Sequence, residues 1–204
     1  MEKIITVVGT TASGKSDLGI VLAKKFNGEI VSCDSRQVYK GLDLGTGKVI
    51  LEEQNEVKHH LLDIKKPNEK FSLAEYQNLA YRSINDILAR KKVPFLVGGT
   101  GLYSRAVTEG YNLSEEEDNP ALREEINGMK TEEIVEKLKS LGEDVPEGLS
   151  PRHLSRRLEK ALKGVAATQN KQIYDYLQLI PVFPRDVLYN RIELRLDARL
   201  DAGM

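Results

Sequence analysis

The residues with the clearest chemical meaning lie near the amino terminus, in an eight-residue run of glycines, hydroxyl side chains and a lysine. The run consists of Gly9, Thr10, Thr11, Ala12, Ser13, Gly14, Lys15 and Ser16. This is the G-x-x-x-x-G-K-[ST] spacing of a P-loop, in which glycines let successive backbone N–H groups surround a phosphate. Lys15 brings a positive charge to the phosphate chain, and the Ser16 hydroxyl is suited to bind Mg²⁺. The run predicts binding of a nucleotide such as ATP or of a pyrophosphate ester.

The segments on either side of this run support that interpretation. Ile4 to Val8 is a short apolar run typical of a buried strand, and Glu29 to Cys33 predicts a second strand. Between them, the segment from Asp17 to Phe26 predicts a helix whose apolar face carries Leu18, Val21, Leu22 and Phe26. Strand, P-loop, helix and strand form a βαβ unit, which implies a parallel sheet. The expected fold class is α/β, a P-loop NTPase-like parallel sheet flanked by helices, with a small helical insertion.

Two further strand ends carry polar residues that should meet the P-loop, because ligands bind at the carboxyl ends of parallel strands. The second strand is followed by Asp34, Ser35, Arg36 and Gln37. Asp34 could bind Mg²⁺ through water or accept a proton from a nucleophile, or it could cap a turn. The strand predicted at Pro94 to Val97 leads into Gly98-Gly99-Thr100-Gly101. Thr100 could donate to a phosphate oxygen or cap the next helix.

The same strand argues against a nucleotide hydrolase or a motor. P-loop NTPases usually place a metal-binding Asp at the end of such a strand, and this chain has glycines and Thr100 there. His59 and His60 lie in a short strand predicted at 59–62. Neither has a cysteine or carboxylate nearby at the spacing of a metal site, so a role at a strand end is favoured over zinc.

The rest of the chain predicts further helices around the α/β body. Helices are expected at Ser72 to Lys91, from Leu102, in two short charged stretches within 120–141, at Pro151 to Val165 and at Asp186 to Leu200, with a last strand at Tyr176 to Phe183. The expected organisation has a first core part at 1–111, a small RNA-facing helical insertion at 112–150 and a second core part at 151–204.

The helix predicted from Pro151 carries an apolar face and an opposite basic stripe. The stripe consists of Arg152, Arg156, Lys160 and Lys163. A basic stripe can neutralise nucleic-acid phosphates. Taken alone, however, the pattern favours an ordinary solvated surface helix.

Composition limits the possible settings and partners. The 204 residues have a formal net charge of −1, so RNA would have to be held by a local basic patch. Cys33 is the single cysteine, which excludes an internal disulfide and indicates a reducing, cytoplasmic setting. The sequence has no apolar run of membrane-spanning length and no recognisable signal peptide, so we expect no membrane association. We expect a monomer.

Four ordered motifs together closely resemble the tRNA dimethylallyltransferase family, also called IPP transferases. They are Gly9 to Ser16, Asp34 to Thr46, His59 to Ile64 and Val97 to Tyr103. The similarity continues through Arg156, Leu158, Glu159, Arg191, Arg195, Asp197 and Gly203, and therefore covers essentially the whole chain. The combination is specific, whereas the P-loop alone would not be.

The resemblance implies a substrate pair and a set of roles. The donor would be dimethylallyl diphosphate, bound with Mg²⁺ through the P-loop, and the acceptor would be N6 of adenosine 37 in the anticodon loop of tRNA. Asp34 resembles the general base, Lys15 and Thr100 resemble residues that act at the pyrophosphate, and Arg156 resembles one that can also reach it. The segments that resemble tRNA contacts contain Asp34, Ser35, Arg36, Gln37 and Thr100, and also Arg152, His153, Leu154, Ser155 and Arg156.

The chain departs from the family pattern in a few places. His153 stands where the family commonly has Arg, Arg157 where it has Ala, and Gly47-Lys48-Val49 where it usually has Ala-Lys-Pro. Members usually continue beyond the equivalent of Gly203-Met204, so we expect a C-terminally short member. Three alternatives stay open: a P-loop small-molecule kinase, a cytokinin-type enzyme that prenylates adenine nucleotides, and a non-catalytic RNA-binding protein.

Overall fold

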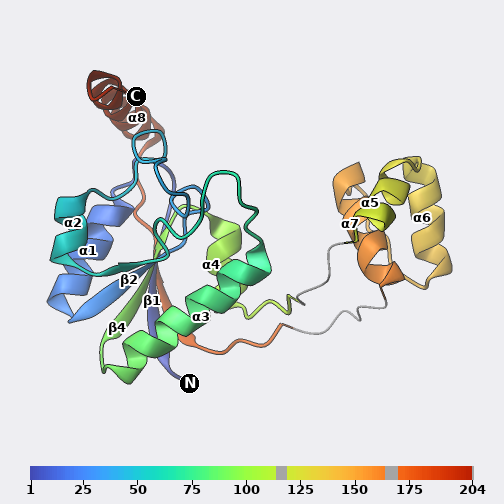
Figure 1. The fold of residues 1–204 in the computed structure, drawn as a ribbon, viewed down its shortest axis with the longest axis horizontal. Coiled ribbons are helices and arrows are strands. Elements are labelled where there is room, and N and C mark those ends of the chain that lie inside the picture. The colour runs from blue at the N-terminus through green and yellow to red at the C-terminus, as the bar shows by residue number, and fades with distance from the viewer. Residues whose placement is uncertain (114–118, 164–169, 204) are drawn as a thin grey trace. The chain divides into compact units, whose positions relative to one another are not determined.

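The structure, a computed structural model, describes residues 1–113, 119–163 and 170–203. The chain divides into two compact units (Figure 1). The first unit comprises Met1–Leu113 and Asn170–Met204, and the second comprises Ser114–Gln169. The second unit is therefore inserted into the first, between two segments that belong to the same sheet-containing body.

The first unit is built on a five-stranded sheet in the order β3-β2-β4-β1-β5, and every neighbouring pair is parallel. The strands are β1 (Lys3–Val8), β2 (Gly28–Ser32), β3 (His59–His60), β4 (Val93–Gly98) and β5 (Asp175–Leu179). The α/β class and the parallel sheet are confirmed. The last strand ends at Leu179, before the predicted Phe183, and β3 is shorter than predicted.

Helices cover both faces of this sheet. They are α1 (Lys15–Lys25), α3 (Leu73–Ala89) and α4 (Gly101–Thr108). The short α2 (Leu51–Glu56) packs beside α1. The helix α8 (Arg185–Asp201) has no buried residue and extends away from the sheet (Figure 1). One apolar cluster joins α3 and α4 to alternate residues of the strands, such as Val31 and Leu96. A second cluster joins α1 to the residues between them, such as Ile30 and Phe95. The period of two along each strand separates the two core layers.

The face by which α1 meets the sheet differs from the prediction. Val21 and Phe26 were expected on it, but they are 60% and 49% exposed, and the buried residues are Gly19, Ile20 and Ala23. A Cβ added at Gly19 would lie 2.9 Å from Val97 Cγ2. Small residues therefore let this helix approach the strands closely, and the larger apolar side chains lie away from the contact.

The second unit is a three-helix body made of α5 (Pro120–Asn127), α6 (Thr131–Ser140) and α7 (Pro151–Leu162). Its core joins residues from all three helices: Ile126, Ile134, Leu138, Leu154 and Leu158. The predicted end of the insertion at residue 150 is therefore wrong, since the inserted unit includes the whole of α7. α7 belongs to the inserted unit, because its apolar face packs on α5 and α6 and not on the sheet.

The two chain segments that lead to the second unit are joined in the first unit. The backbone N of Lys171 donates to the carbonyl oxygen of Gly110 at 2.9 Å. Gly110 has φ of 62°, and an added Cβ would lie 1.8 Å from Lys171 O. Only glycine allows this close approach, so the outgoing and returning segments are fixed side by side.

Candidate active site

The P-loop bends sharply between β1 and α1. Gly14 stands at the N-cap of α1 with φ of 72°, and Ala12 has φ of 61°. Glycine adopts this left-handed conformation at no steric cost, whereas a residue with a Cβ rarely does. Such backbone strain costs about 1–3 kcal/mol and clusters at ligand-binding sites. The strained turn immediately precedes the amino-terminal end of α1, where a helix favours an anion.

Two side chains of the loop suit a phosphate group. The Ser13 side chain is buried, and its Oγ has no hydrogen-bond partner among the described residues. A buried hydroxyl without a partner costs about 1–3 kcal/mol, so a phosphate oxygen fits this position. Lys15 folds back over the loop, and its Nζ donates to Thr10 O at 3.3 Å. Burial lowers the pKa of Lys15, an effect that Asp34 opposes and Arg195 strengthens.

Asp34 follows β2 and lies close to the P-loop lysine, as predicted from the strand order. Its Oδ1 accepts a hydrogen bond from the backbone N of Arg36 at 2.9 Å, which fixes the orientation of the carboxylate. Within the described parts of the chain, no other hydrogen bond is made to this carboxylate. Asp34 therefore keeps acceptor capacity for a ligand.

The loops after β2 and β4 are held together by backbone and hydroxyl contacts. A Cβ added at Gly98 would lie 2.5 Å from the Cys33 backbone, so only glycine fits there. Thr100 N donates to Cys33 O at 3.1 Å. The Thr100 hydroxyl accepts from Ser35 N at 2.9 Å and donates to Ser35 Oγ at 3.2 Å. Thr100 occupies the N-cap of α4 without a side-chain cap bond, and its hydroxyl positions the loop that carries Asp34.

Helix α8 adds arginines that the sequence analysis did not assign to the site. Arg191, Arg195 and Arg199 recur every four residues and lie along one stripe of the helix. A Cβ added at Gly14 would lie 3.3 Å from Arg191 Nη2. Arg195 Nη2 donates to Gly47 O at 3.2 Å, and burial together with Arg195 lowers the pKa of Arg199. The i, i+4, i+8 spacing was a signal in the sequence for this stripe.

These elements enclose a cavity of about 310 Å³ in the first unit. Its polar lining includes Thr11, Lys15, Ser16, Asp34, Arg36, Gln37, Arg195 and Arg199. Its apolar lining includes Ile30, Val49, Leu62 and Val97. The cavity therefore combines cations, one carboxylate and an apolar wall, the composition that a ligand with an anionic head and a small apolar part requires.

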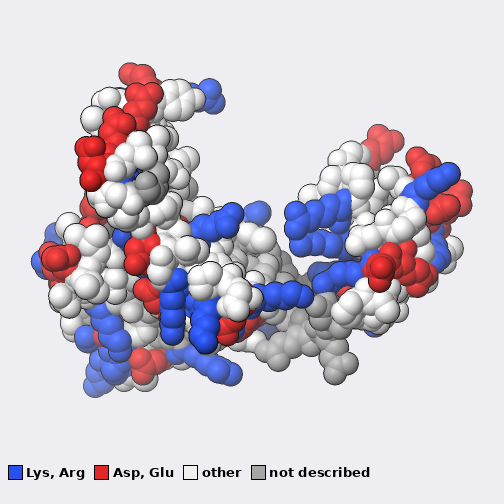
Figure 2. Space-filling model, turned by 45° about the horizontal axis from the view of Figure 1, so that its top comes forward, with Lys and Arg blue, Asp and Glu red and all other residues white. Residues whose placement is uncertain are grey.

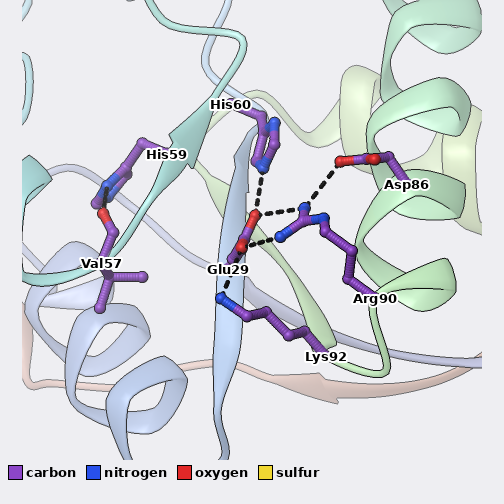
Figure 3. A network of polar contacts seen from close by, with 7 residues as sticks. All are labelled: Glu29, Val57, His59, His60, Asp86, Arg90 and Lys92. Carbon is purple, nitrogen blue, oxygen red and sulfur yellow. Dashed lines mark hydrogen bonds and ion pairs between the residues drawn. The ribbon is translucent and has the colours of Figure 1, made fainter.

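The adjacent residues His59 and His60 make different contacts (Figure 3). The ring of His59 contacts Val57 O through Nδ1 at 2.7 Å and also lines the cavity. His60 Nε2 lies 2.8 Å from Glu29 Oε2, in a network that also includes Arg90 and Lys92. No group of three metal-ligating side chains occurs in residues 1–113, 119–163 and 170–203.

The second group of predicted contact residues lies on α7. Arg152, His153 and Arg156 are exposed, and His153 Nδ1 contacts Ser150 Oγ at 2.9 Å. Ser155 is partly buried and lines a shallow cavity of this unit. The prediction that Leu154 contacts the tRNA is wrong, because this residue is 4% exposed and belongs to the apolar core of the second unit.

The basic stripe on α7 is partly neutralised within its own unit. Glu159 pairs with Arg123 at 3.1 Å and with Lys163 at 3.0 Å. Arg152 and Arg156 form no ion pair with a described residue. Figure 2 shows basic side chains gathered on one side of this unit and mixed charges on the rest. Of the predicted basic stripe, the exposed members are Arg152, Arg156 and Lys160.

The fold and the cavity define a P-loop α/β protein whose site places a group of cations beside a carboxylate at the carboxyl ends of its strands. A family model described as IPP transferase matches residues 37–204. The chain belongs to the IPP transferase family.

Curated relatives and solved structures agree with this assignment. A tRNA dimethylallyltransferase of Bacillus pumilus is 40% identical over the whole chain, which covers 68% of that protein. One from Lactococcus lactis is 43% identical, with 70% of that protein covered. A full-length tRNA isopentenylpyrophosphate transferase from Bacillus halodurans superposes with a TM-score of 0.69 at 39% identity, covering the whole chain and 67% of that structure. A eukaryotic dimethylallyltransferase acting on tRNA gives a TM-score of 0.85 at 27% identity, covering the whole chain and 54% of that structure.

No helix in the described part of the chain is long and apolar enough to span a membrane.

Proposed function

We propose that this enzyme transfers the dimethylallyl group of dimethylallyl diphosphate to N6 of an adenosine beside the anticodon of tRNA, at position 37 of the family's substrates. The observation that supports this most strongly is the cavity at the strand ends. It holds Lys15, Arg195 and Arg199 together with the Asp34 carboxylate and an apolar wall. An anionic head, a short hydrocarbon and an amine nucleophile match these three kinds of lining group.

The cationic part of the cavity suits the diphosphate. The P-loop supplies backbone N–H groups and Lys15, and α8 supplies arginines. Negative charge grows on the diphosphate as its bond to carbon breaks. Fixed donors and cations aimed at that charge stabilise the transition state more than the ground state. The apolar residues Val49, Leu62 and Val97 offer a wall for the five-carbon group.

The carboxylate of Asp34 suits the amine acceptor, because it can take up a proton. The lone pair of an exocyclic adenine amine is delocalised into the ring, so the amine needs a partner that takes its proton as the new bond forms. In the proposed step the N6–carbon bond forms, the carbon–oxygen bond breaks, its electron pair leaves with the diphosphate, and the N6 proton moves to the Asp34 carboxylate. The base must first be flipped out of its stack, which costs a few kcal/mol and least in a loop.

The same residues fit a magnesium ion. Mg²⁺ is commonly bound by one or two protein oxygens together with substrate phosphates and water, and it does not need a cage of protein ligands. Ser16 and Asp34 both line the cavity, with Ser16 positioned at the first turn of α1. Ser16 would hold the ion through its hydroxyl, together with the diphosphate and water. When bound, the ion supplies positive charge to the leaving diphosphate.

Helix α7 is proposed as a phosphate-binding surface for the RNA. Arg152, Arg156 and Lys160 are exposed at intervals of four residues on the helix, away from Leu154 and Leu158 in the core. Such a stripe neutralises backbone phosphates without reading sequence. The tRNA named for the curated relatives and for the eukaryotic neighbour supports this assignment.

Labelled dimethylallyl diphosphate with Mg²⁺ tests the proposal, in parallel reactions with tRNA, AMP or ATP as acceptor. We expect label in tRNA and release of pyrophosphate. Label in AMP or ATP but not in tRNA would replace the proposal with a cytokinin-type activity. ADP formed from ATP and a small alcohol, with no labelled RNA, would establish a kinase instead. Binding of tRNA without transfer to any acceptor would establish a non-catalytic RNA-binding protein.

A further inference from the structure

The side chain of Lys48, in the loop that borders the cavity, is buried and binds three other residues. Its side chain is 3% exposed, and Nζ donates to Tyr39 O at 2.8 Å, Asp43 Oδ1 at 2.6 Å and Asp63 Oδ1 at 2.5 Å. These contacts use all three donors of the ammonium group. Burial lowers the pKa of Lys48, but the hydrogen bonds to Asp43 and Asp63 outweigh burial and raise it overall. The group is therefore held charged and fixed in place.

The loop that Lys48 holds has little regular structure of its own. Residues 41–48 contain Gly41, Gly45 and Gly47, and glycines make a loop costly to order. Lys48, at the end of this loop, joins Tyr39 before the loop and Asp43 within it to Asp63, which follows β3. A buried, fully satisfied polar group of this kind fixes one loop conformation.

The residue before Lys48 links the two sides of the proposed reaction. Gly47 O accepts from Gln37 Nε2 at 3.1 Å and from Arg195 Nη2 at 3.2 Å. Gln37 belongs to the loop that begins with Asp34, and Arg195 belongs to the arginine stripe beside the P-loop. One carbonyl oxygen thus sets the separation between a residue on the acceptor side and a cation on the diphosphate side.

We propose that Lys48, through Asp43 and Asp63, is a positioning residue that holds the Gly47 carbonyl where it aligns Gln37 with Arg195. This inference rests on the proposed transfer reaction. In this proposal Lys48, whose three donors are all used within the protein, acts by ordering the groups that contact the substrates. Misplacing reacting groups by about 1 Å can cost about a hundredfold in rate.

The test compares K48M and K48R with wild type, and K40M is the control because Lys40 is an exposed lysine immediately before the same loop. Steady-state kcat and the KM values for dimethylallyl diphosphate and tRNA are measured per folded molecule, with the folded fraction taken from thermal unfolding. We expect K48M to lower kcat about ten- to a hundredfold with smaller changes in both KM values. K48R, which keeps the charge, should recover most of the rate, and K40M should match wild type.

A double-mutant cycle with Q37A separates positioning from general stability. If the Gly47 carbonyl couples the two residues, Q37A should have a much smaller effect on kcat in the K48M background than in wild type. Additive effects, an unchanged kcat in K48M, or a loss that K48R does not recover would overturn the inference. Should K48M fail to fold, D43N serves instead, since Asp43 is largely exposed, and an unchanged kcat in D43N would overturn it. A wild type without transferase activity would refute the proposed function, independently of Lys48.

Discussion

The two ends of β2 carry charged groups that are treated in opposite ways. At its start, Glu29 is buried, paired with the two cations Arg90 and Lys92, and in contact with the ring of His60 (Figure 3). After its end, Asp34 carries one backbone hydrogen bond from within the described residues, and Lys15 donates to a single carbonyl. The P-loop, which follows β1 at the same edge of the sheet, adds the buried Ser13 hydroxyl, which has no hydrogen-bond partner among the described residues.

The difference separates a group that serves the fold from groups that serve a ligand. A buried carboxylate with every oxygen paired stabilises the protein only as long as all of its partners stay in place. A carboxylate and an ammonium with spare capacity contribute less to stability and can exchange their contacts for a substrate. Substitutions at the two ends of the strand should therefore affect different quantities.

The largest expected effect is on catalysis, through Asp34→Asn. Asparagine keeps the size and one acceptor oxygen but cannot take the N6 proton. Transfer should slow by roughly 10²–10⁴-fold while the donor and tRNA still bind. Single-turnover rates with labelled donor measure this, and Asp175→Asn, at an exposed position on β5, is the control. Transfer at the normal rate in Asp34→Asn would exclude the general-base role and remove the contrast with Glu29.

Glu29→Gln should instead reduce stability. The substitution leaves Arg90 and Lys92 without their shared negative charge, in a site where the Glu29 side chain is 2% exposed. We expect the free energy of unfolding at pH 7 to fall by about 3 kcal/mol, the lower end for a broken buried pair, because Arg90 and Lys92 are partly exposed. Urea titration measures it, with the exposed Glu2→Gln as control. A loss no greater than that of the control would contradict the structural role.

The pH dependence of this effect has a definite sign. The pKa of Glu29 is lowered from its ordinary value near 4.5, mainly by the hydrogen bond from Arg90. A lowered pKa gives stability that is present above about pH 4.5 and is lost as the pH falls below it, because only the unfolded chain takes up the proton there. The stability difference between wild type and Glu29→Gln should shrink from about pH 5 to about pH 3. A difference that stays constant would show that the charge is not its cause.

Lys15→Ala tests whether the cationic side of the cavity, like Asp34, serves a ligand and not the stability of the fold. A charge-assisted contact to phosphate is worth about 1.5–3 kcal/mol, so affinity for dimethylallyl diphosphate should fall by roughly one to two orders of magnitude. Calorimetric titration measures this, and Lys25→Ala, at the exposed end of the same helix, is the control. Unfolding free energy should change little, since Lys15 forms no ion pair with a described residue. Unchanged donor affinity would remove the P-loop assignment.

The smallest effect concerns the second unit. Charge reversal at Arg152, Arg156 and Lys160 should weaken tRNA binding and reduce its salt dependence, by about 0.7–0.9 in the log–log slope for each lost phosphate contact. Binding measured at several salt concentrations tests this, with the exposed Lys139→Glu on α6 as control. A slope equal to that of wild type would make α7 an ordinary surface helix.

Much of the α/β body could be predicted because its signals are local. The apolar runs at β1, β2 and β4 each form a strand, and each is followed by the polar residues that gather at the sheet edge. The P-loop spacing and the position of Asp34 after β2 therefore placed these groups near one another correctly. The parallel direction of the strands follows from the short connections between strand and helix.

The parts that were missed depend on contacts between distant segments. α7 has the same apolar periodicity whether it packs on a sheet or on α5 and α6, so the sequence could not decide its unit. The buried face of α1 was misassigned, because Gly19 and Ala23 pack closest although larger apolar residues stand beside them. The arginines of α8 are visible as a spacing, but their position beside Gly14 and Gly47 requires the fold.

The backbone contact between Gly110 and Lys171 has a consequence for how this enzyme can be taken apart. Because the two segments leading to the three-helix unit are already side by side, a short turn can replace that unit without stretching the sheet. The remaining chain would keep the P-loop, Asp34 and α8. The inserted body is thus a detachable module, which could also be exchanged for one of different length in a hybrid enzyme while the donor cavity is left whole.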